Sequence, residues 1–358
     1  MRIAYLLEWE FDKIDGVIQK VLNQADIWRS FGHEVKIFAL SNTKDTLKIE
    51  GVKNYQKSIK NLIYFNNLYK DLVAFNSNIV YFRYSSYKPY LNWIFKRFKS
   101  VLELNTNDLS EQELLKDVNF KEKFAYYNTL LTYKYMQSLV SGIVAVTNEI
   151  ANSIFYKDKL TAVIPNSINL DSYKTKKRAE KKEVPNLVFI GSPNQNWHGI
   201  DKIISLAKAS QDKLFFHIIG ENKPKDLELK NIKFYGYMKK DEYKEVLLNS
   251  DIGIGTLALH RKNMQEACPL KVREYLAFGL PIVIGYKDTA LIDKEFDWVL
   301  ELPNAEDNIE KNIQRVIDFC YARENIVVKA SEVKEVIDSS YWERKRVDFF
   351  KRVVDGEV

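Results

Sequence analysis

Short apolar runs alternate with amphipathic segments from the start of the chain. The first run, residues 3–7, precedes a segment between residues 17 and 28 whose apolar side chains recur at helical spacing. A second apolar run, residues 33–40, follows almost at once. A strand, a helix and another strand in this order predict a βαβ opening, the unit from which parallel sheets are built.

The same alternation continues through the whole chain. Strands that alternate with helices indicate parallel sheets covered on both faces. We therefore predict an α/β fold of two doubly wound units in tandem, with ligands bound at the carboxyl ends of the strands and a cleft between the units as the expected site. The further predicted strands are 78–84, 100–104, 142–146, 161–165, 186–191, 214–220, 232–237, 251–257 and 281–286.

A charge-dense stretch marks the predicted domain boundary. Residues 174–183, KTKKRAEKKE, have the composition of a linker rather than that of a strand or a packed helix. We predict a first domain over residues 1–173, a linker over 174–184 and a second domain over 185–338. The last segment, residues 339–358, is amphipathic, and we predict a helix that returns to the first domain.

Length and composition are typical of a globular protein. The 358 residues suggest two domains, and 46% apolar with 28% charged residues excludes a disordered or collagen-like chain. Two cysteines, Cys268 and Cys320, imply neither a disulfide framework nor a zinc-type cysteine pair, and they favour a cytoplasmic setting. The N-terminus lacks the layout of a secretory signal, and no uncharged apolar run approaches the roughly 18 residues that span a bilayer.

The net charge of +6 lies in the first half, because residues 1–180 carry +7 and residues 181–358 carry −1. Within the first half, residues 88–99, KPYLNWIFKRFK, interleave four basic residues with aromatic ones. As a helix this segment would lie on an anionic membrane surface and bring the site to a lipid-linked acceptor. Packing on the sheet, with the lysines reaching solvent, is the alternative. Nucleic acid is not expected as a partner, since the charge is modest and no recognised binding motif occurs.

The densest chemical signal is residues 265–286, QEACPLKVREYLAFGLPIVIGY. Pro269 suits the first turn of a helix, because its missing N–H would be unpaired there anyway. Gly279 suits the end of that helix, and the proline after it prevents continuation. We therefore predict a helix over about residues 269–278, directly after a buried strand and its connecting loop.

Two glutamates flank the start of this helix. The free N–H groups of Leu270 and Lys271, together with the helix dipole and the lysine charge, would bind an anion, above all phosphate. Glu266 precedes the helix and Glu274 lies inside it, and each carboxylate can accept paired hydrogen bonds from vicinal sugar hydroxyls. Solvated surface carboxylates are the alternative for two glutamates taken alone. The combination predicts a nucleotide-sugar pocket.

With these motifs the sequence resembles the retaining glycosyltransferases of the GT-B fold, specifically glycosyltransferase family 4. The resemblance covers nearly the whole chain: the first loop around Gly16, FGHEVKIFAL, AVIPNSINLDSY and, most specifically, the Glu266–Glu274 motif running into EYLAFGLPIVI. It implies two Rossmann-like domains facing a central cleft, the first binding the acceptor and the second the donor. It also implies sugar transfer from a nucleotide-diphosphate sugar with retention of configuration and without a metal ion or other cofactor.

The resemblance assigns roles to individual residues. Glu274 would hold the donor ribose, and Glu266 would hold hydroxyls of the sugar ring and support the charge that develops at the anomeric carbon. The backbone at Pro269 and Leu270 would donate to the diphosphate. Gly16 would let the chain pass close to the donor phosphate and the acceptor.

The segment GSPNQNWHGID departs from the family pattern. Ser192 and His198 stand where the family has an arginine and a lysine, so two fixed positive charges are missing. We hypothesise that Lys271, with Arg261 or Lys262, neutralises the leaving diphosphate and that His198 donates a hydrogen bond. A hydrogen-bonding residue beneath the following helix is the alternative for His198.

Candidates for acceptor and nucleobase contacts come from strand ends. Glu103, Asn105 and Asp108, in ELNTND, stand where many relatives carry a histidine, and turn and cap formation is the alternative for all three. Residues that would border the nucleobase, with ordinary loop residues as the alternative, are Glu221, Tyr237 and Met238.

The resulting interpretation is a cytoplasmic enzyme, peripheral on the inner face of the membrane, that transfers a sugar to a saccharide or lipid-linked saccharide in surface polysaccharide assembly. Two alternatives stay open. One is a nucleotide-sugar epimerase or hydrolase on the same fold. The other is a non-catalytic nucleotide-sugar-binding partner subunit. The departures from the family pattern at Ser192 and His198 are the reason to consider it.

Overall fold

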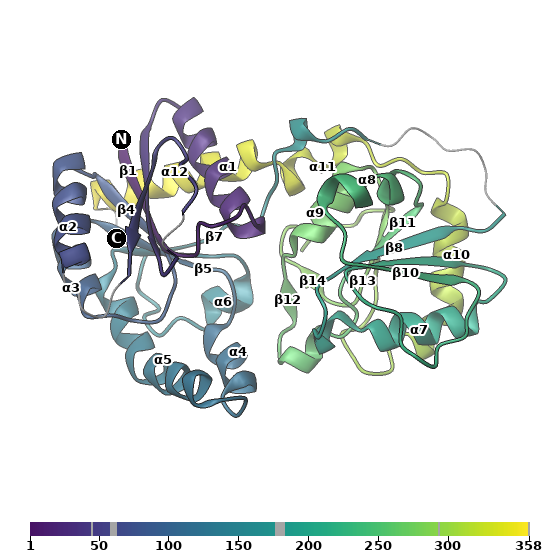
Figure 1. Ribbon diagram of the computed structural model, residues 1–358. Helices are drawn as coiled ribbons and strands as arrows, with labels where there is room; N and C mark the ends of the chain where they lie inside the picture. Colours follow the sequence, from purple (N-terminus) through teal and green to yellow (C-terminus); the bar gives the residue numbers. More distant parts are fainter. Residues whose placement is uncertain (44–45, 58–62, 176–182, 293, 357–358) are drawn as a thin grey trace. The chain divides into compact units, whose positions relative to one another are not determined.

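The computed structural model describes residues 1–358 apart from 44–45, 58–62, 176–182, 293 and 357–358. The chain forms two compact units (Figure 1), the first comprising Met1–Ile164 with Ser339–Val358 and the second Pro165–Asp338. Most of the predicted linker lies outside the described residues. In the described part of the chain, no helix has both the length and the apolar character needed to cross a bilayer.

A seven-stranded sheet forms the centre of the first unit. Its strands are all parallel, in the order β3-β2-β1-β4-β5-β6-β7. The order runs outward in both directions from β1, as in a doubly wound fold. The strands are β1 (Arg2–Glu8), β2 (Glu34–Ser41), β3 (Val52–Gln56), β4 (Ile79–Arg83), β5 (Ser100–Leu104), β6 (Gly142–Ala145) and β7 (Thr161–Val163).

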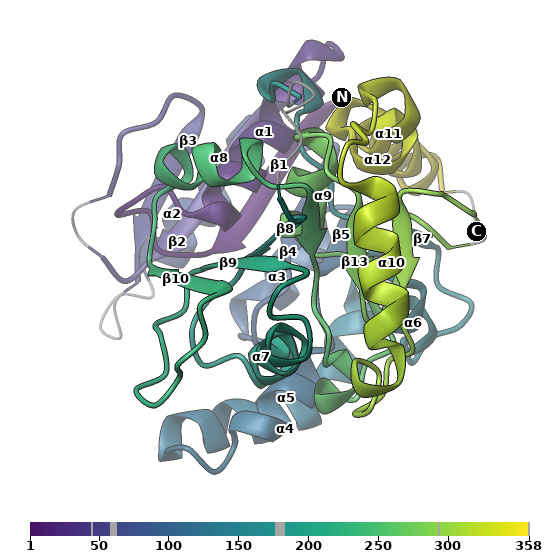
Figure 2. The ribbon, with the colours of Figure 1, turned by 90° about the vertical axis from the view of Figure 1, so that its right-hand side faces the viewer.

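Helices cover both faces of this sheet, which is why its central strands are apolar throughout. On one face the C-terminal helix α12 packs beside α1 (Figures 1 and 2), and Trp28 of α1 contacts Tyr5 and Phe350 there. On the other face Phe82 contacts Phe95 of α3. The helices of this unit are α1 (Gly16–Ser30), α2 (Ile63–Phe75), α3 (Tyr90–Arg97), α4 (Asp108–Leu115), α5 (Phe120–Leu139), α6 (Asn148–Asn152) and α12 (Ser339–Asp355).

A second parallel sheet, of six strands in the order β10-β9-β8-β11-β13-β15, forms the core of the second unit, and a separate pair joins β12 to β14. The strands are β8 (Asn186–Ile190), β9 (Phe215–Ile219), β10 (Ile232–Gly236), β11 (Ile252–Ile254), β12 (Glu266–Ala267), β13 (Ile282–Ile284), β14 (Lys287–Asp288) and β15 (Val299–Glu301). The helices are α7 (Ile200–Ala209), α8 (Lys240–Leu248), α9 (Leu270–Ala277), α10 (Ile313–Arg323) and α11 (Ala330–Ile337), with short 3₁₀ helices η1 (Leu170–Ser172), η2 (Asn196–His198), η3 (Leu259–Lys262) and η4 (Glu310–Asn312).

The boundary between the units falls at Pro165, before the predicted end of the first domain at residue 173. The segment that follows is tied to the second unit by hydrogen bonds. The Asn166 side chain donates to the Cys268 carbonyl at 2.9 Å, and the Tyr173 hydroxyl donates to Glu274 at 3.0 Å. The segment AVIPNSINLDSY is therefore divided between the units. Its first residues, which complete β7, belong to the first unit, and the rest belongs to the second.

Candidate active site

Helix α9 begins where the sequence predicted, within one residue. Pro269 takes the N-cap position in an extended conformation, and Gly279 has a φ of +82° directly after the C-cap. Pro269 makes no side-chain capping hydrogen bond at this N-terminus. Because the first N–H groups of a helix have no intrahelical acceptor, those of Leu270 and Lys271 are available to an anion.

Lys271, the second residue of α9, supplies a buried cation at this helix start. Its Nζ has no hydrogen-bond partner among the described residues and lies 4.2 Å from the centre of the Phe189 ring. Burial lowers the pKa of Lys271 to about 7, with the charge of Glu221 opposing the shift. An ammonium without a counterion is costly to bury, so the position favours an anionic ligand.

His198 is the last residue of η2 and contacts the same aromatic ring. Its ring centre lies 5.4 Å from that of Phe189, and the side chain is only 8% exposed. Nδ1 has no hydrogen-bond partner in the described part of the chain. Burial, with the nearby charge of Lys271, lowers the pKa of His198 to about 3, so the imidazole is neutral at pH 7. The structure thus brings together the two residues proposed to contact the diphosphate.

The residues that follow β8 and β9 are glycines, Gly191 and Gly220, and both lie in tightly packed positions. Gly191 follows β8, and a Cβ there would lie 2.8 Å from Nδ1 of His198. Gly220 follows β9 with a φ of +91°, and a Cβ there would lie 1.8 Å from the Gly191 carbonyl oxygen. At Gly191 the side chains of Phe189 and His198 leave no room for a Cβ, and at Gly220 the backbone of Gly191 leaves none.

The remaining strand-end candidates differ in exposure. Ser192 is exposed after β8, and it supplies no charge in place of the family's arginine. Glu221 is half-buried, and burial raises the pKa of its carboxyl while Lys271 opposes the shift. Tyr237 is 86% exposed, and Met238 is half-buried. The proposed contacts of Glu221, Tyr237 and Met238 with a nucleobase stay predictions.

Glu274 lies one turn into α9 and is held from both sides. The hydroxyl of Tyr173 donates to Oε1 at 3.0 Å, and that of Tyr243 donates to Oε2 at 3.1 Å. Lys240 Nζ lies 3.1 Å from Oε1 and donates to the Tyr173 hydroxyl at 2.6 Å. Burial and the Glu274 charge raise the pKa of both tyrosines, which keeps them protonated as donors. The carboxylate is therefore fixed in orientation.

Glu266 lies in a short strand rather than in the predicted loop. In the β12–β14 pair it stands opposite Lys287, and Thr289 Oγ1 donates to its Oε2 at 3.3 Å. The side chain is half-buried. Pairing with β14 fixes the backbone of Glu266 three residues before the helix N-cap, Pro269.

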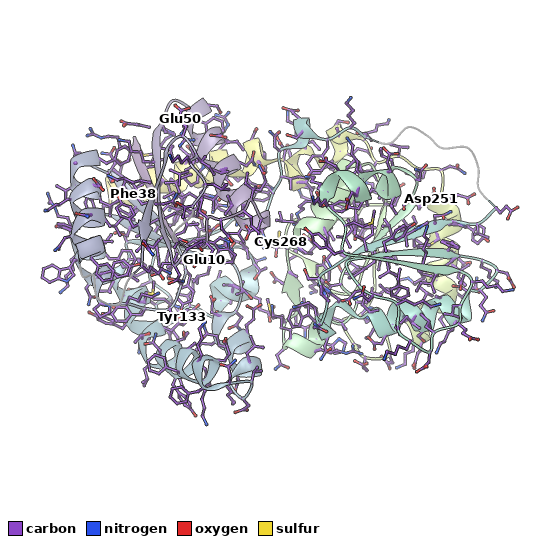
Figure 3. The ribbon with its side chains drawn as sticks, viewed as in Figure 1. Glu10, Phe38, Glu50, Tyr133, Asp251 and Cys268 are labelled. Carbon is purple, nitrogen blue, oxygen red and sulfur yellow. The ribbon has the colours of Figure 1, made fainter. Side chains whose placement is uncertain are left out.

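A buried ion pair anchors α9 to β14. Arg273 and Asp288 are joined by two hydrogen bonds of 2.6 and 2.7 Å, and both side chains are fully buried. Arg273 Nε also donates to the Asn166 carbonyl at 3.0 Å, and an Nη donates to Cys268 Sγ at 2.6 Å. Cys268, labelled in Figure 3, lies between Glu266 and the helix. This cluster was not predicted, and it holds the motif in shape.

Arg261 does not fit its hypothesised role. Its guanidinium donates to both oxygens of Asp201, at 2.9 and 2.7 Å, and to Glu306 at 3.1 Å. Two carboxylates therefore already neutralise this charge. Lys262 lies over the Trp197 ring at 4.8 Å and is only 8% exposed. The structure leaves Lys271 as the cation at the helix start.

Within the described ranges, no group of three or more His, Cys, Asp and Glu side chains could hold a metal ion. Metal independence of the reaction stays a prediction.

In the first unit, Gly16 is the first residue of α1, directly after the N-cap Asp15. A Cβ at Gly16 would meet nothing within 4 Å, so the position faces open space. Asp108 is the first residue of α4, and the N-cap before it is Asn107. Asn105 accepts a hydrogen bond from Lys20 at 2.7 Å.

Glu103 requires a correction. Its carboxylate is fully buried and lies 2.9 Å from Lys20, 3.5 Å from Arg83 and 3.9 Å from Arg346. These cations hold the pKa of the Glu103 carboxyl well below its usual range, against the effect of burial. Its short strand is buried on both faces, so the side chain serves the interior of the unit and not an acceptor.

Sequence and structure comparisons relate the chain to known glycosyltransferases. Residues 184–318, which include β8 to β15 and the whole Glu266–Glu274 motif, match the family model described as glycosyl transferases group 1. The matched residues lie within the second unit. A search of curated protein sequences finds no match.

Solved structures of glycosyltransferases are similar over the whole chain. Sucrose-phosphate synthase from Thermosynechococcus elongatus aligns with a TM-score of 0.70 at 11% identity, over 99% of this chain and 100% of that chain. A lipopolysaccharide outer core galactosyltransferase aligns with a TM-score of 0.67 at 11% identity, over 100% of both chains. An α-glucosyltransferase in complex with UDP-glucose and DNA aligns with a TM-score of 0.65 at 14% identity, over 98% of this chain and 99% of that chain.

These comparisons confirm the predicted GT-B fold with its two Rossmann-like units. The family match and the fold identify the protein as a glycosyltransferase, an enzyme of sugar transfer.

Proposed function

We propose that this glycosyltransferase moves a sugar from a nucleoside diphosphate sugar to a saccharide or lipid-linked saccharide, with retention of configuration and without a metal ion. The observation that carries the proposal is the start of α9, where Lys271 and His198 Nδ1 are buried without hydrogen-bond partners in the described residues. Lipopolysaccharide galactosyltransferase is among the similar structures, which supports a role in surface polysaccharide assembly.

The leaving diphosphate is the anion that this arrangement fits. The N–H groups of Leu270 and Lys271 point along the helix dipole, and the Lys271 ammonium adds a full charge. Neutral His198 donates one hydrogen bond from its ring, and Lys271 takes over the neutralising role of the missing arginine and lysine pair. No metal is required in this scheme, because these groups stabilise the charge that develops on the phosphate.

Glu274 and Glu266 hold the two ends of the donor. The carboxylate of Glu274, oriented by Tyr173 and Tyr243, accepts hydrogen bonds from the ribose hydroxyls on its remaining lone pairs. Glu266 accepts hydroxyls of the transferred sugar and supports positive charge at the anomeric carbon. The departing phosphate oxygen then accepts the proton of the acceptor hydroxyl on the same face, which gives retention.

The acceptor in the proposal is a saccharide, free or lipid-linked, and the site of action is the cytoplasmic face of a membrane. The α-glucosyltransferase among the similar structures is in complex with DNA. We do not extend that acceptor to this chain, because it carries only a modest net charge of +6.

A thermal-shift panel of UDP, GDP, dTDP and CMP with their common sugars tests the donor site, because selective binding raises apparent stability by mass action. We expect one nucleotide to raise the melting temperature of the wild type and to have no effect on Glu274→Ala. Absence of any shift would contradict the proposal in favour of a non-catalytic subunit. Donor turnover without any acceptor would instead indicate an epimerase or hydrolase.

The orientation of Glu274 gives a second test, in which Tyr243→Phe removes one donor from the carboxylate. The wild type should bind the ribonucleotide more tightly than its 2′-deoxy analogue, and Tyr243→Phe should reduce that preference about fivefold, as expected for one hydrogen bond. Isothermal titration measures both ligands. Tyr321→Phe, at an exposed position on α10, is the matched control. An unchanged preference in Tyr243→Phe would show that the tyrosine only packs beside the helix.

A further inference from the structure

Helix α5 of the first unit is amphipathic in an unusual sense, because its outer face is more apolar than its inner face. The side chains that it buries are Thr129, Tyr133, Met136 and Gln137, half of them polar. Tyr133, labelled in Figure 3, contacts Tyr84 and Phe155 on this inner side. Packing within the unit therefore does not account for the apolar residues on the opposite side of the helix.

The outer face carries a continuous apolar row, which we call the α5 stripe and define as Phe120, Phe124, Tyr127 and Leu131. Their exposed fractions are 84%, 67%, 49% and 80%. The spacing of i, i+4, i+7 and i+11 places all four on one side of a helix. A contiguous exposed apolar surface of this kind marks an interaction site.

Apolar residues on neighbouring segments extend the surface. Val118, in the connection from α4, is 67% exposed, and Trp93 on α3 is 73% exposed. Helix α3 packs against α5, and Tyr135 donates a hydrogen bond to Asn92 of α3 at 2.9 Å. Trp93 therefore belongs to the same region of the unit, at which α3 and α5 lie near one another in Figure 1.

On α5 itself, basic side chains flank the stripe, while the connected helix α4 and the loop after it carry the acidic residues Asp108, Glu111, Glu113 and Asp117. Helix α5 carries three exposed lysines, Lys121, Lys123 and Lys134, against one acidic residue, Glu122. Lys96 and Arg97 are exposed at the end of α3. An apolar stripe bordered by lysines, with aromatic residues among the apolar ones, is complementary to an anionic lipid surface, in which rings enter the headgroup region and lysines contact phosphates.

The predicted membrane segment, residues 88–99, contributes less than expected. Tyr90 and Phe95 are 6% and 5% exposed, and Trp93 is the aromatic residue of α3 that faces outward. This helix mainly packs on the sheet, as the alternative stated.

We propose that the α5 stripe docks the enzyme on an anionic lipid bilayer. The proposal rests on the proposed function in that a lipid-linked acceptor would be met at such a surface. Its test does not depend on turnover or on donor binding.

Co-sedimentation of the full chain with vesicles tests the proposal. We expect the wild type to bind vesicles of phosphatidylglycerol and phosphatidylcholine, and to bind pure phosphatidylcholine weakly. Phe124→Glu with Leu131→Glu should reduce the bound fraction about tenfold or more, since it places charges in the apolar face. Replacing Lys121, Lys123 and Lys134 by glutamine should weaken binding and its salt dependence.

Tyr321→Glu on α10 is the matched control, an exposed aromatic residue of the second unit that should bind as the wild type does. Melting temperatures establish that each variant folds, and Leu131→Glu alone serves if the double variant does not. Equal vesicle binding by wild type and stripe variants would overturn the proposal, as would no binding by the wild type. Wild-type self-association that Leu131→Glu abolishes, without vesicle binding, would overturn it in favour of a second copy.

The nucleotide-induced thermal shift of the same variants separates the two proposals. Stripe variants should keep it while losing vesicle binding. A wild type that binds vesicles but no nucleotide would contradict the proposed donor site and leave the docking surface standing.

Discussion

Replacement of Lys271 by methionine is expected to lower kcat of sugar transfer by about 100-fold or more, the range measured when a preorganised group that stabilises developing negative charge is removed. Lys271 is the buried cation at the start of α9, and its Nζ has no hydrogen-bond partner among the described residues. Methionine retains the length and apolar packing of the side chain over Phe189. Lys208→Met, at an exposed position on α7, is the control. Turnover within about threefold of wild type would remove Lys271 from the mechanism, since one preorganised charge is worth more than that.

The pKa of Lys271 gives the same variant a signature in binding. At pH 8 most Lys271 side chains are neutral, because burial lowers the pKa to about 7. A bound diphosphate favours the charged form, so nucleotide binding at pH 8 should take up close to one proton. Titration calorimetry in two buffers of different ionisation enthalpy measures this uptake. Lys271→Met should bind the nucleotide more weakly and take up fewer protons on binding.

The lowered pKa of Lys271 should also make the unfolding free energy of the unliganded protein depend on pH. Between pH 7 and pH 10.5 the unfolded chain holds a proton on Lys271 that the folded chain has released, so this group makes stability rise with pH across that window. Below pH 7 the folded protein buries the charge at full cost. The gain in stability of Lys271→Met over wild type should therefore be greatest below pH 7 and disappear near pH 10.5.

Most of the fold was predictable because its central strands are buried on both faces. Runs such as 100–104 and 142–146 are mainly apolar, and they form β5 and β6 with nearly the predicted bounds. β3 (Val52–Gln56) was missed because three of its five residues are polar and its apolar residues do not alternate with them, so it carries no strand signal. β12 and β14, two residues each, depend on pairing with one another and not on their own sequence.

The helix at the site was predictable because its turn chemistry is local, whereas its supporting contacts are not. Pro269 and Gly279 bound α9 through their own backbone preferences. The donors to Glu274 come from Tyr173 and Tyr243, 101 and 31 residues away in the sequence. Nothing in the sequence indicates that either tyrosine contacts Glu274. Glu103 failed as a candidate for the opposite reason, because strand-end position does not show that three cations surround a buried carboxylate.

Removing Arg273 should have the largest effect on stability. Arg273→Met leaves Asp288 fully buried without its partner, and breaking a buried ion pair in this way costs about 3–5 kcal/mol. Urea unfolding followed by circular dichroism measures the change. Arg261→Met is the control, because its carboxylate partners are largely exposed and such a pair contributes about 1 kcal/mol or less.

The double variant Arg273→Met with Asp288→Leu distinguishes the charge from the packing. If the cost arises from an unpaired buried carboxylate, the double variant should recover much of the lost stability, since replacing both partners by apolar groups is often nearly neutral. Donor binding should not recover, because the same guanidinium also joins α9 to the Asn166 carbonyl and to Cys268. A stable double variant that bound nucleotide as well as wild type would mean that Pro269 and the β12–β14 pair position the helix start without this anchor.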